Sequence, residues 1–269
     1  MIDTHCHLNF KAFKNDYDEV ISRSFKKGIK TLMIVGSNYK TSEKAIEIAK
    51  KFKNCYVSPG LHPIHVKEEK FDKKKYIPLI RANSRIVKAI GETGFDFFHI
   101  SGNIQHVAQN KEMQKEVFLK HLELAKEFDL SVILHCRGEA SDPLKAYEDL
   151  LLVIRSLLFV PLGVIHCFSA NWQIAQKFLD LGFYLGFTGI ITYKNCGQDL
   201  LEVVAKTPLK KILIETDAPY LAPEPYRSQR CEPWHVKFTA QKISKIKKIT
   251  PEKVIEQTTQ NAKKLFKLT

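Results

Sequence analysis

The sequence lacks the closely spaced cysteine pairs of zinc ribbons and of redox motifs. It contains six cysteines among 269 residues, none of them in a Cys-x-x-Cys pattern. This spacing favours neither a disulfide framework nor a zinc ribbon. The N-terminus also has no basic segment followed by an apolar one, so we expect no secretory signal. Together these absences predict a cytoplasmic protein.

An apolar segment long enough to span a membrane is missing as well. The longest apolar stretch, residues 150–168, is interrupted by Arg155, Ser156 and Pro161. A membrane-spanning helix needs about 20 consecutive, mainly apolar residues. We therefore expect no contact with a membrane, and the sequence gives no sign of an obligate protein partner.

Arginine is scarce, although the chain as a whole is strongly basic. Lys and Arg number 42 against 29 Asp and Glu, a net charge of +13, but only seven of the basic residues are Arg. A basic excess favours polyanionic partners such as nucleic acid, because it neutralises phosphates and releases counterions. The lysines are scattered along predicted helix faces, however, as a lysine-biased composition would also produce. Charge alone leaves both interpretations open.

Short runs rich in Val and Ile recur along the chain, and most are followed by a segment with helical spacing. This alternation is the pattern of βαβ units. The predicted strands are residues 2–6, 31–35, 55–58, 87–90, 131–134, 163–166, 183–187 and 212–215. The predicted helices are residues 16–27, 41–53, 72–82, 111–128, 143–158, 172–181, 198–206, 234–247 and 251–266.

Eight strands alternating with helices predict an α/β fold, a TIM (β/α)₈ barrel. Such barrels typically form one domain of about 250 residues, so we expect a single domain over residues 1–269. Residues 93–110 show no regular pattern, and a βα loop of this length is commonly functional.

Histidines and carboxylates fall at the carboxyl ends of five predicted strands. These six candidate metal ligands are His5, His7, Glu92, His135, His166 and Asp217. A single strand-end histidine is more often structural, but in a parallel barrel all these ends open on one face, where barrel active sites lie. Four imidazoles and two carboxylates exceed one tetrahedral zinc and suit two divalent metals bridged by a carboxylate. Such a pair can activate a water for phosphoryl displacement.

The cysteines beside these histidines are not expected to be ligands. Strand alternation sends His5 and His7 to one side of the first strand and Cys6 to the other. The same alternation directs Cys136 and Cys167 toward the helix layer. We interpret all three as small buried hydrophobic residues.

Motifs along nearly the whole chain resemble those of TatD-family deoxyribonucleases. The matching segments are Asp3-Thr4-His5-Cys6-His7-Leu8, Gly60-Leu61-His62-Pro63, Gly91-Glu92-Thr93-Gly94-Phe95-Asp96, Ile133-Leu134-His135-Cys136-Arg137, His166-Cys167-Phe168-Ser169 and Glu215-Thr216-Asp217-Ala218-Pro219-Tyr220-Leu221. The resemblance implies a TIM barrel that hydrolyses DNA phosphodiesters as a 3′-to-5′ exonuclease. It also implies two divalent metal ions per chain, with Mg²⁺, Mn²⁺ and Zn²⁺ all compatible with mixed His and carboxylate donors.

The resemblance assigns a role to each candidate ligand. It implies that one metal is held by His5, His7, Glu92 and Asp217. The other is held by Glu92, His135 and His166, so that Glu92 bridges the two. Asp217 resembles the acid that orients or deprotonates the attacking water, which makes Glu92 and Asp217 the catalytic candidates.

Substrate-binding candidates lie in loops beside the ligands. Arg137, Arg227 and Arg230 have guanidinium groups suited to phosphate, although a pair with Glu224 or Glu232 is the alternative for them. His62 either contacts phosphate or shapes a turn with Pro63. The aromatic residues of the 97–99 segment either stack on bases or anchor the loop.

Some positions depart from the family pattern. Thr93 and Phe95 stand in the motif around Glu92, and Cys231 stands where the family usually has Asn before Glu-Pro. None of these removes a candidate ligand, so substrate preference is more open than hydrolysis. DNA with single-stranded or 3′ ends is the expected partner.

Two other functions remain possible from the sequence. An amidohydrolase-like or phosphotriesterase-like barrel would act on a small molecule, but it commonly bridges its metals with a carboxylated lysine where this chain has Glu92. A barrel that only binds nucleic acid would not need six intact ligands.

Overall fold

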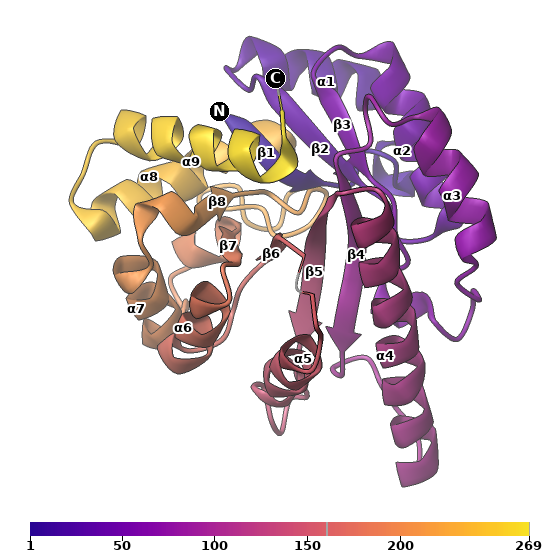
Figure 1. The fold of residues 1–269 in the computed structure, drawn as a ribbon. Coiled ribbons are helices and arrows are strands. Elements are labelled where there is room, and N and C mark those ends of the chain that lie inside the picture. The colour runs from indigo at the N-terminus through magenta and orange to yellow at the C-terminus, as the bar shows by residue number, and fades with distance from the viewer. Residues whose placement is uncertain (160, 269) are drawn as a thin grey trace.

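The computed structural model describes residues 1–159 and 161–268, and it confirms the predicted TIM barrel (Figure 1). The strands are β1 (Ile2–Cys6), β2 (Thr31–Val35), β3 (Cys55–Ser58), β4 (Ala89–Asp96), β5 (Ser131–Arg137), β6 (Gly163–Ile165), β7 (Tyr184–Phe187) and β8 (Ile212–Ile214). The helices are α1 (Tyr17–Lys26), α2 (Tyr39–Lys51), α3 (Lys73–Ala82), α4 (Ile104–Glu127), α5 (Lys145–Arg155), α6 (Trp172–Asp180), α7 (Gln198–Lys206), α8 (Val236–Lys247) and α9 (Pro251–Phe266). Short 3₁₀ helices include Pro63–His65 and Gly189–Thr192.

The barrel closes where two parallel sheets meet. One sheet contains β1, β2 and β3, and the other runs in order from β4 to β8. Parallel bridges join Cys6 to Ala218 at one seam and Val57 to Val87 at the other. At the first seam the backbone N–H of His7 donates to the Ala218 carbonyl at 2.7 Å. Closure brings the carboxyl ends of all eight strands to one rim.

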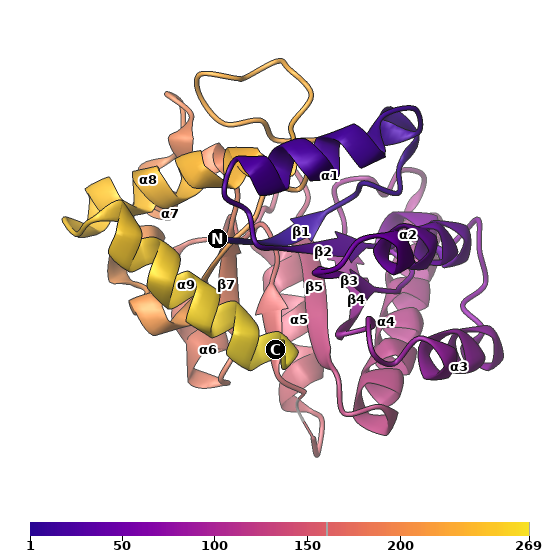
Figure 2. The ribbon, with the colours of Figure 1, turned by 90° about the horizontal axis from the view of Figure 1, so that it is seen from above.

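Helix α9 closes the opposite end of the barrel. Inward-facing side chains from the strands pack against the last turns of this helix in one buried cluster. The cluster contains Ile2, Met33, Val35, Ala89, Ile133, Val164, Tyr184, Leu213, Ala262, Leu265, Phe266 and Leu268. The hydroxyl of Ser131 also donates to the Leu265 carbonyl at 2.5 Å. Figure 2 shows α9 crossing the barrel in this way, so a site can open only at the carboxyl-end rim.

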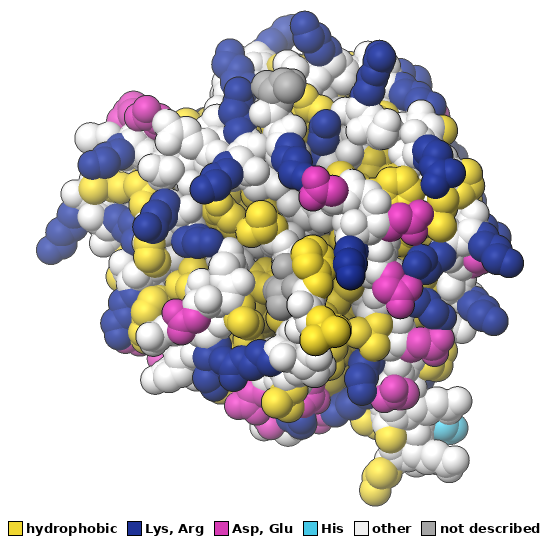
Figure 3. All heavy atoms as spheres, viewed as in Figure 1, with side chains coloured by type: hydrophobic (Ala, Val, Ile, Leu, Met, Phe, Trp, Pro, Cys, Tyr) yellow, Lys and Arg dark blue, Asp and Glu magenta, His cyan; other side chains and the backbone are white. Residues whose placement is uncertain are grey.

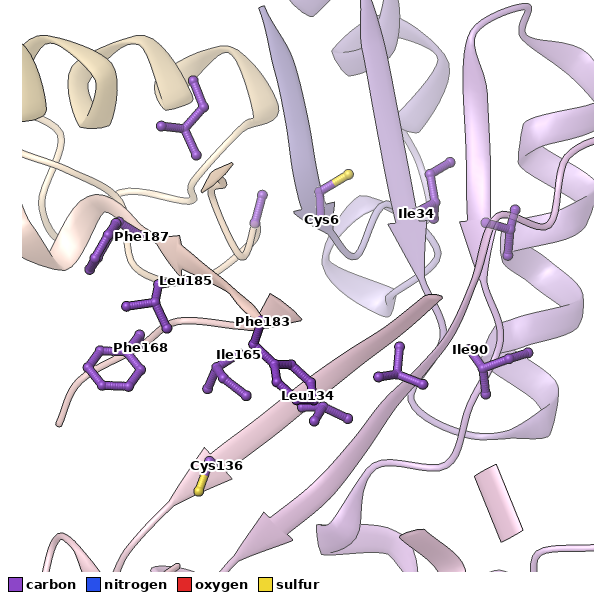
Figure 4. Packing of buried hydrophobic residues seen from close by; sticks show 14 of the residues in the cluster. Cys6, Ile34, Ile90, Leu134, Cys136, Ile165, Phe168, Phe183, Leu185 and Phe187 are labelled. Atoms are coloured by element: carbon purple, nitrogen blue, oxygen red, sulfur yellow. The ribbon is translucent and has the colours of Figure 1, made fainter. Parts of the chain in front are cut away.

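The outward faces of the strands form a second core with the surrounding helices (Figure 4). Successive strand residues alternate between the two cores, as Ile133 and Leu134 of β5 do. Cys6 and Cys136 are buried in the outer core. The expectation that these two cysteines face the helix layer is therefore confirmed.

Strand β4 and helix α4 are both longer than predicted. β4 continues to Asp96 instead of ending at residue 90, and α4 begins at Ile104 instead of residue 111. The predicted irregular segment 93–110 is thus wrong, because only residues 97–103 connect the two elements. The register of β4 against β5 shifts between Ile90 and Thr93, where Gly91 has a φ of +141°.

Glycine makes this continuation possible. A Cβ on Gly91 would lie 2.4 Å from the Ile133 carbonyl oxygen, so only glycine lets β4 approach β5 so closely there. The side chain of Asn103 accepts from the His106 N–H and starts α4, whose first turns reach past the tips of β4 and β5 (Figure 1). No helix in the described part of the chain is long and apolar enough to cross a membrane.

Candidate metal centre

Four side chains converge at the carboxyl-end rim: His5 and His7 at the end of β1, Glu92 within β4 and Asp217 after β8. The Nε2 atoms of His5 and His7 lie 3.1 Å apart. Oε2 of Glu92 lies 3.4 Å from His5 Nε2 and 3.7 Å from His7 Nε2. Oδ1 of Asp217 lies 3.7 Å and 3.2 Å from the same two nitrogens. Ligand atoms about 2.1 Å from a tetrahedral metal are about 3.4 Å apart, so these separations suit one cation.

The other carboxylate oxygen of Glu92 faces a second group of imidazoles. Oε1 lies 2.9 Å from His135 Nδ1, 3.5 Å from His62 Nε2 and 3.9 Å from His166 Nε2. His62, Glu92 and His135 could thus hold a second cation. The sequence left two roles open for His62, a phosphate contact or a turn with Pro63. The structure supports the turn, because Nδ1 of His62 accepts from the Ile64 N–H at 3.1 Å at the start of the 3₁₀ helix Pro63–His65. Its Nε2 also lies 3.5 Å from Glu92, and phosphate binding stays a prediction.

His166 lies between the two groups. Its Nε2 is 3.7 Å from Asp217 Oδ1, nearer than it is to Glu92. Its ring stacks on the ring of His5 with centroids 3.5 Å apart. The structure therefore brings all six candidate ligands together without assigning His166 to one group alone.

Asp96 belongs to this site, and the sequence analysis missed it. His135 donates from Nδ1 to Glu92 and from Nε2 to Asp96, each at 2.9 Å. The backbone N–H of His99 donates to the same Asp96 carboxylate at 3.0 Å. Burial opposes charge on His135, but the hydrogen bonds to Asp96 and Glu92 outweigh it and raise its pKa to about 9. The available signal was alternation, since Asp96 follows Glu92 at an even spacing in β4.

Two carboxylates of the site are held ionised. Burial disfavours the ionised form of Glu92, yet His62, His5 and the hydrogen bond from His135 hold its pKa well below its usual range. Burial likewise opposes ionisation of Asp217, and His7 and His166 outweigh it and lower that pKa.

Two of the imidazoles are correspondingly hard to protonate. Burial, with a contribution from His135, lowers the pKa of His62 to about 4. Burial and the neighbouring His166 also lower the pKa of His5. Ionised carboxylates and neutral imidazoles are the protonation states that a metal site requires.

The three arginines predicted to bind substrate have different surroundings. Arg137 stacks over Phe98 at 3.7 Å, and Arg227 stacks over Tyr193 at 3.9 Å. Both are exposed. The guanidinium of Arg230 instead donates to both carboxylate oxygens of Asp16, at 2.9 and 2.5 Å. Asp16 would therefore compete with a phosphate for the guanidinium of Arg230. Phosphate binding by Arg230 stays a prediction.

The aromatic residues after β4 were expected either to stack on bases or to anchor the loop, and the structure separates them. Phe97 is buried and stacks on Phe95, with ring centroids 5.6 Å apart, so it anchors the loop. Phe98 is 46% exposed beside Arg137. Of these two phenylalanines, only Phe98 is exposed enough to stack on a base.

Cys167 departs from the expectation for the cysteines. β6 ends at Ile165, and Cys167 has a φ of +46°, so strand alternation does not apply to it. Its Sγ lies 3.4 Å from the hydroxyl of Thr188, and it is half-buried. The prediction that Cys167 faces the helix layer is therefore wrong.

His121 of α4 supports the loop that carries His62. Its Nε2 accepts from the backbone N–H of Leu61 at 3.0 Å, and its Nδ1 donates to the Val117 carbonyl at 2.8 Å. The side chain is fully buried. The contact with Leu61 requires an unprotonated Nε2, so protonation of the ring would remove the acceptor that Leu61 uses.

We expect His121 to make stability depend on pH. Burial lowers its pKa from 6.5 to about 4. The unfolded chain therefore binds this proton more readily, and the stabilisation is complete above pH 6.5 and lost as the pH falls to about 4. The shift corresponds to about 3 kcal/mol. Urea unfolding of wild type and His121→Gln between about pH 4 and 7.5 measures it. A difference in unfolding free energy that does not shrink at low pH would contradict this assignment.

A closed parallel barrel that gathers imidazoles and carboxylates at the carboxyl ends of its strands is the architecture of metal-dependent hydrolases. The chain belongs to the TatD-related DNase family, whose sequence profile matches residues 2–267. This match confirms the resemblance seen in the motifs.

Individual relatives match over their full length. The uncharacterized metal-dependent hydrolase YabD of Bacillus subtilis (strain 168) is 34% identical over 269 residues, covering 100% of this chain and 99% of the relative. The 3′-5′ ssDNA/RNA exonuclease TatD of Salmonella typhimurium is 30% identical over 273 residues, with the same coverage of 100% and 99%. The crystal structure of YjjV, a TatD homologue from Escherichia coli K12, matches with a TM-score of 0.84 at 27% identity, covering 100% of this chain and 98% of that one.

Proposed function

We propose that the protein is a two-metal phosphodiesterase that hydrolyses DNA from the 3′ end of single strands. The observation that carries this proposal is the position of Glu92, whose Oε2 faces His5 and His7 while its Oε1 faces His135. A carboxylate with one oxygen toward each group can bridge two cations. Asp217 completes the first set of ligands, and His166 completes the second beside His62.

Asp217 is the proposed acid of the reaction. Two bound divalent ions would supply Lewis-acid polarisation of the phosphodiester and lower the pKa of an attacking water. Asp217 is held ionised, and its side chain is 16% exposed against 3% for Glu92. It can therefore accept a proton from water at the rim while Glu92 stays inside. His135 would give up one proton on binding a cation, since both of its nitrogens donate to carboxylates.

Exposed apolar side chains around the rim support a substrate with unpaired bases. Ile64, Phe98 and Tyr220 follow three different strands and are 42%, 46% and 54% exposed. The rings of Phe98 and Tyr220 could stack on single-stranded bases, and the guanidinium groups of Arg137 and Arg227 suit the phosphates between them. The Salmonella relative is named as an ssDNA/RNA exonuclease, which supports the same substrate class.

Neither alternative function has comparable support. An amidohydrolase-like site commonly uses a carboxylated lysine, and here Glu92 stands between the two groups of imidazoles. Binding without catalysis would not require six convergent donors. We further propose that residues 1–269 form one catalytic domain, since α9 packs into the barrel core. A cytoplasmic location is part of the proposal, because the six cysteines are free thiols.

The test is digestion of end-labelled DNA and RNA, each single- and double-stranded. We expect 3′-to-5′ shortening of single-stranded DNA that EDTA abolishes and that added Mg²⁺, Mn²⁺ or Zn²⁺ restores. Comparable rates on RNA would widen the substrate to single-stranded nucleic acid. The proposal fails if a metal-loaded sample leaves every substrate intact.

Arg137 and Arg227 are expected to bind phosphate without affecting the metals. Replacing either with Ala should reduce the slope of log K against log salt by about 0.7 to 0.9, because one phosphate contact is lost. Metal content should stay unchanged. DNA affinity at several salt concentrations, with exposed Lys26→Ala as control, measures the effect.

The control decides between local and diffuse charge. Lys and Arg are spread over the whole face seen in Figure 3 and do not form a single track. An equal change of slope in Lys26→Ala would mean that this scattered charge binds DNA, and the assignment to the two arginines would be wrong.

A further inference from the structure

Glu215 is a buried carboxylate that the proposed reaction leaves without a role. It follows β8 directly and has no exposed surface. Its Oε1 accepts from the backbone N–H of Cys167 at 2.6 Å. The same oxygen lies 2.8 Å from Nδ1 of His166, at ion-pair distance. An acid buried this deeply needs a specific partner, and His166 is the ionisable group it touches.

The carboxylate of Glu215 packs against a glycine of the barrel wall. Gly186 of β7 faces it, and a Cβ at that position would lie 2.5 Å from Oε2 of Glu215. Any side chain at residue 186 would push the carboxylate away from His166. The contact between Glu215 and His166 thus depends on glycine at a strand position where glycine otherwise weakens packing.

The opposite nitrogen of His166 points toward the proposed ligands. Nε2 lies 3.7 Å from Asp217 Oδ1 and 3.9 Å from Glu92 Oε1. A carboxylate at Nδ1 keeps the proton on that nitrogen and leaves the Nε2 lone pair free. The ring of His166 also stacks on the ring of His5, and this contact restricts rotation of the His166 ring.

We propose that Glu215 is a positioning residue for metal binding, which fixes the ring of His166 with Nε2 toward the cations. The inference rests on the proposed metal site. Glu215 is not itself a ligand, although its oxygen lies near His5 and His166. Its Oε1 accepts from the backbone N–H of Cys167 and lies 2.8 Å from Nδ1 of His166, and a Cβ on Gly186 would lie 2.5 Å from its Oε2. These contacts assign the carboxylate to orienting His166 and not to holding a cation.

The experiment is a double-mutant cycle on Zn²⁺ affinity, measured by competition with a chromophoric chelator. Glu215→Gln should weaken Zn²⁺ binding about 10- to 100-fold, the usual effect of losing a partner behind a ligating histidine. In a His166→Ala background the same change should alter affinity by less than about twofold, because Glu215 then has nothing to position. Glu202→Gln, at an exposed carboxylate of α7, is the matched control.

Gly186→Ala provides a second variant that keeps the carboxylate. It should also weaken Zn²⁺ binding, and again only when His166 is present. Gly197→Ala is its control, since a Cβ at Gly197 meets nothing within 4 Å.

The outcomes separate this inference from the proposed function. An effect of Glu215→Gln that persists without His166 would identify Glu215 as a ligand or a general structural element, and would overturn the inference alone. Unchanged affinity in both Glu215→Gln and Gly186→Ala would also overturn it. Wild-type protein that binds no Zn²⁺ would overturn the metal site and the inference together.

Discussion

Replacing Glu92 with Ala is expected to remove at least one of the two proposed metal ions and to lower turnover by at least about a hundredfold. One carboxylate oxygen faces each group of imidazoles, so its loss separates both groups from their shared donor. Metal assistance contributes several kcal/mol to transition-state stabilisation, which sets the size of the effect. Metal analysis by mass spectrometry and initial rates on single-stranded DNA measure the two results.

The control for this variant is Glu116→Ala, at an exposed carboxylate of α4 that pairs with Lys120. It should keep wild-type metal content and turnover. Circular dichroism of Glu92→Ala should show an intact barrel, because Glu92 lies at the rim and outside both apolar cores. Near wild-type metal content and turnover in Glu92→Ala would refute the bridging role.

Replacing Asp217 with Asn should lower turnover by about 10²- to 10⁴-fold, the usual contribution of a general base. The amide removes the charge that accepts a proton but keeps an oxygen of similar position. His5, His7 and Glu92 remain, so the protein should retain much of its metal. Turnover should therefore fall far more than metal content. Single-turnover cleavage rates with metal analysis of the same sample test this.

Asp199→Asn, at an exposed carboxylate of α7, is the matched control. Loss of metal in proportion to turnover would assign Asp217 a ligand role only. Retention of both would exclude Asp217 from the reaction.

Local patterns were enough to predict the architecture and most of the candidate site. Val- and Ile-rich runs marked all eight strands, because burial on both faces of a parallel strand leaves a continuous apolar run. The bounds of α7 and α9 were predicted to the residue. The six candidate ligands could be selected because a parallel barrel sends all its carboxyl ends to one rim, where the structure brings them together.

Local patterns failed where the backbone was irregular. Two glycines in the Gly91–Asp96 motif looked like the end of a strand, yet they let β4 continue beside β5. The continuation carried Asp96 to His135. The even spacing from Glu92 indicated which face Asp96 takes, but its contact with His135 of β5 came only from the tertiary structure.

Contacts between distant residues were decided by the tertiary structure alone. Closure of the barrel brought Asp16 to Arg230 across 214 positions of sequence, so an arginine predicted to bind phosphate has a partner within the protein. The same closure set Glu215 behind His166 and His62 beside Glu92. Residue type and strand position determined which chemistry reaches the rim. The contacts between these side chains depend on how residues of different strands pack across the closed barrel. Periodicity within one segment carries no information about such contacts.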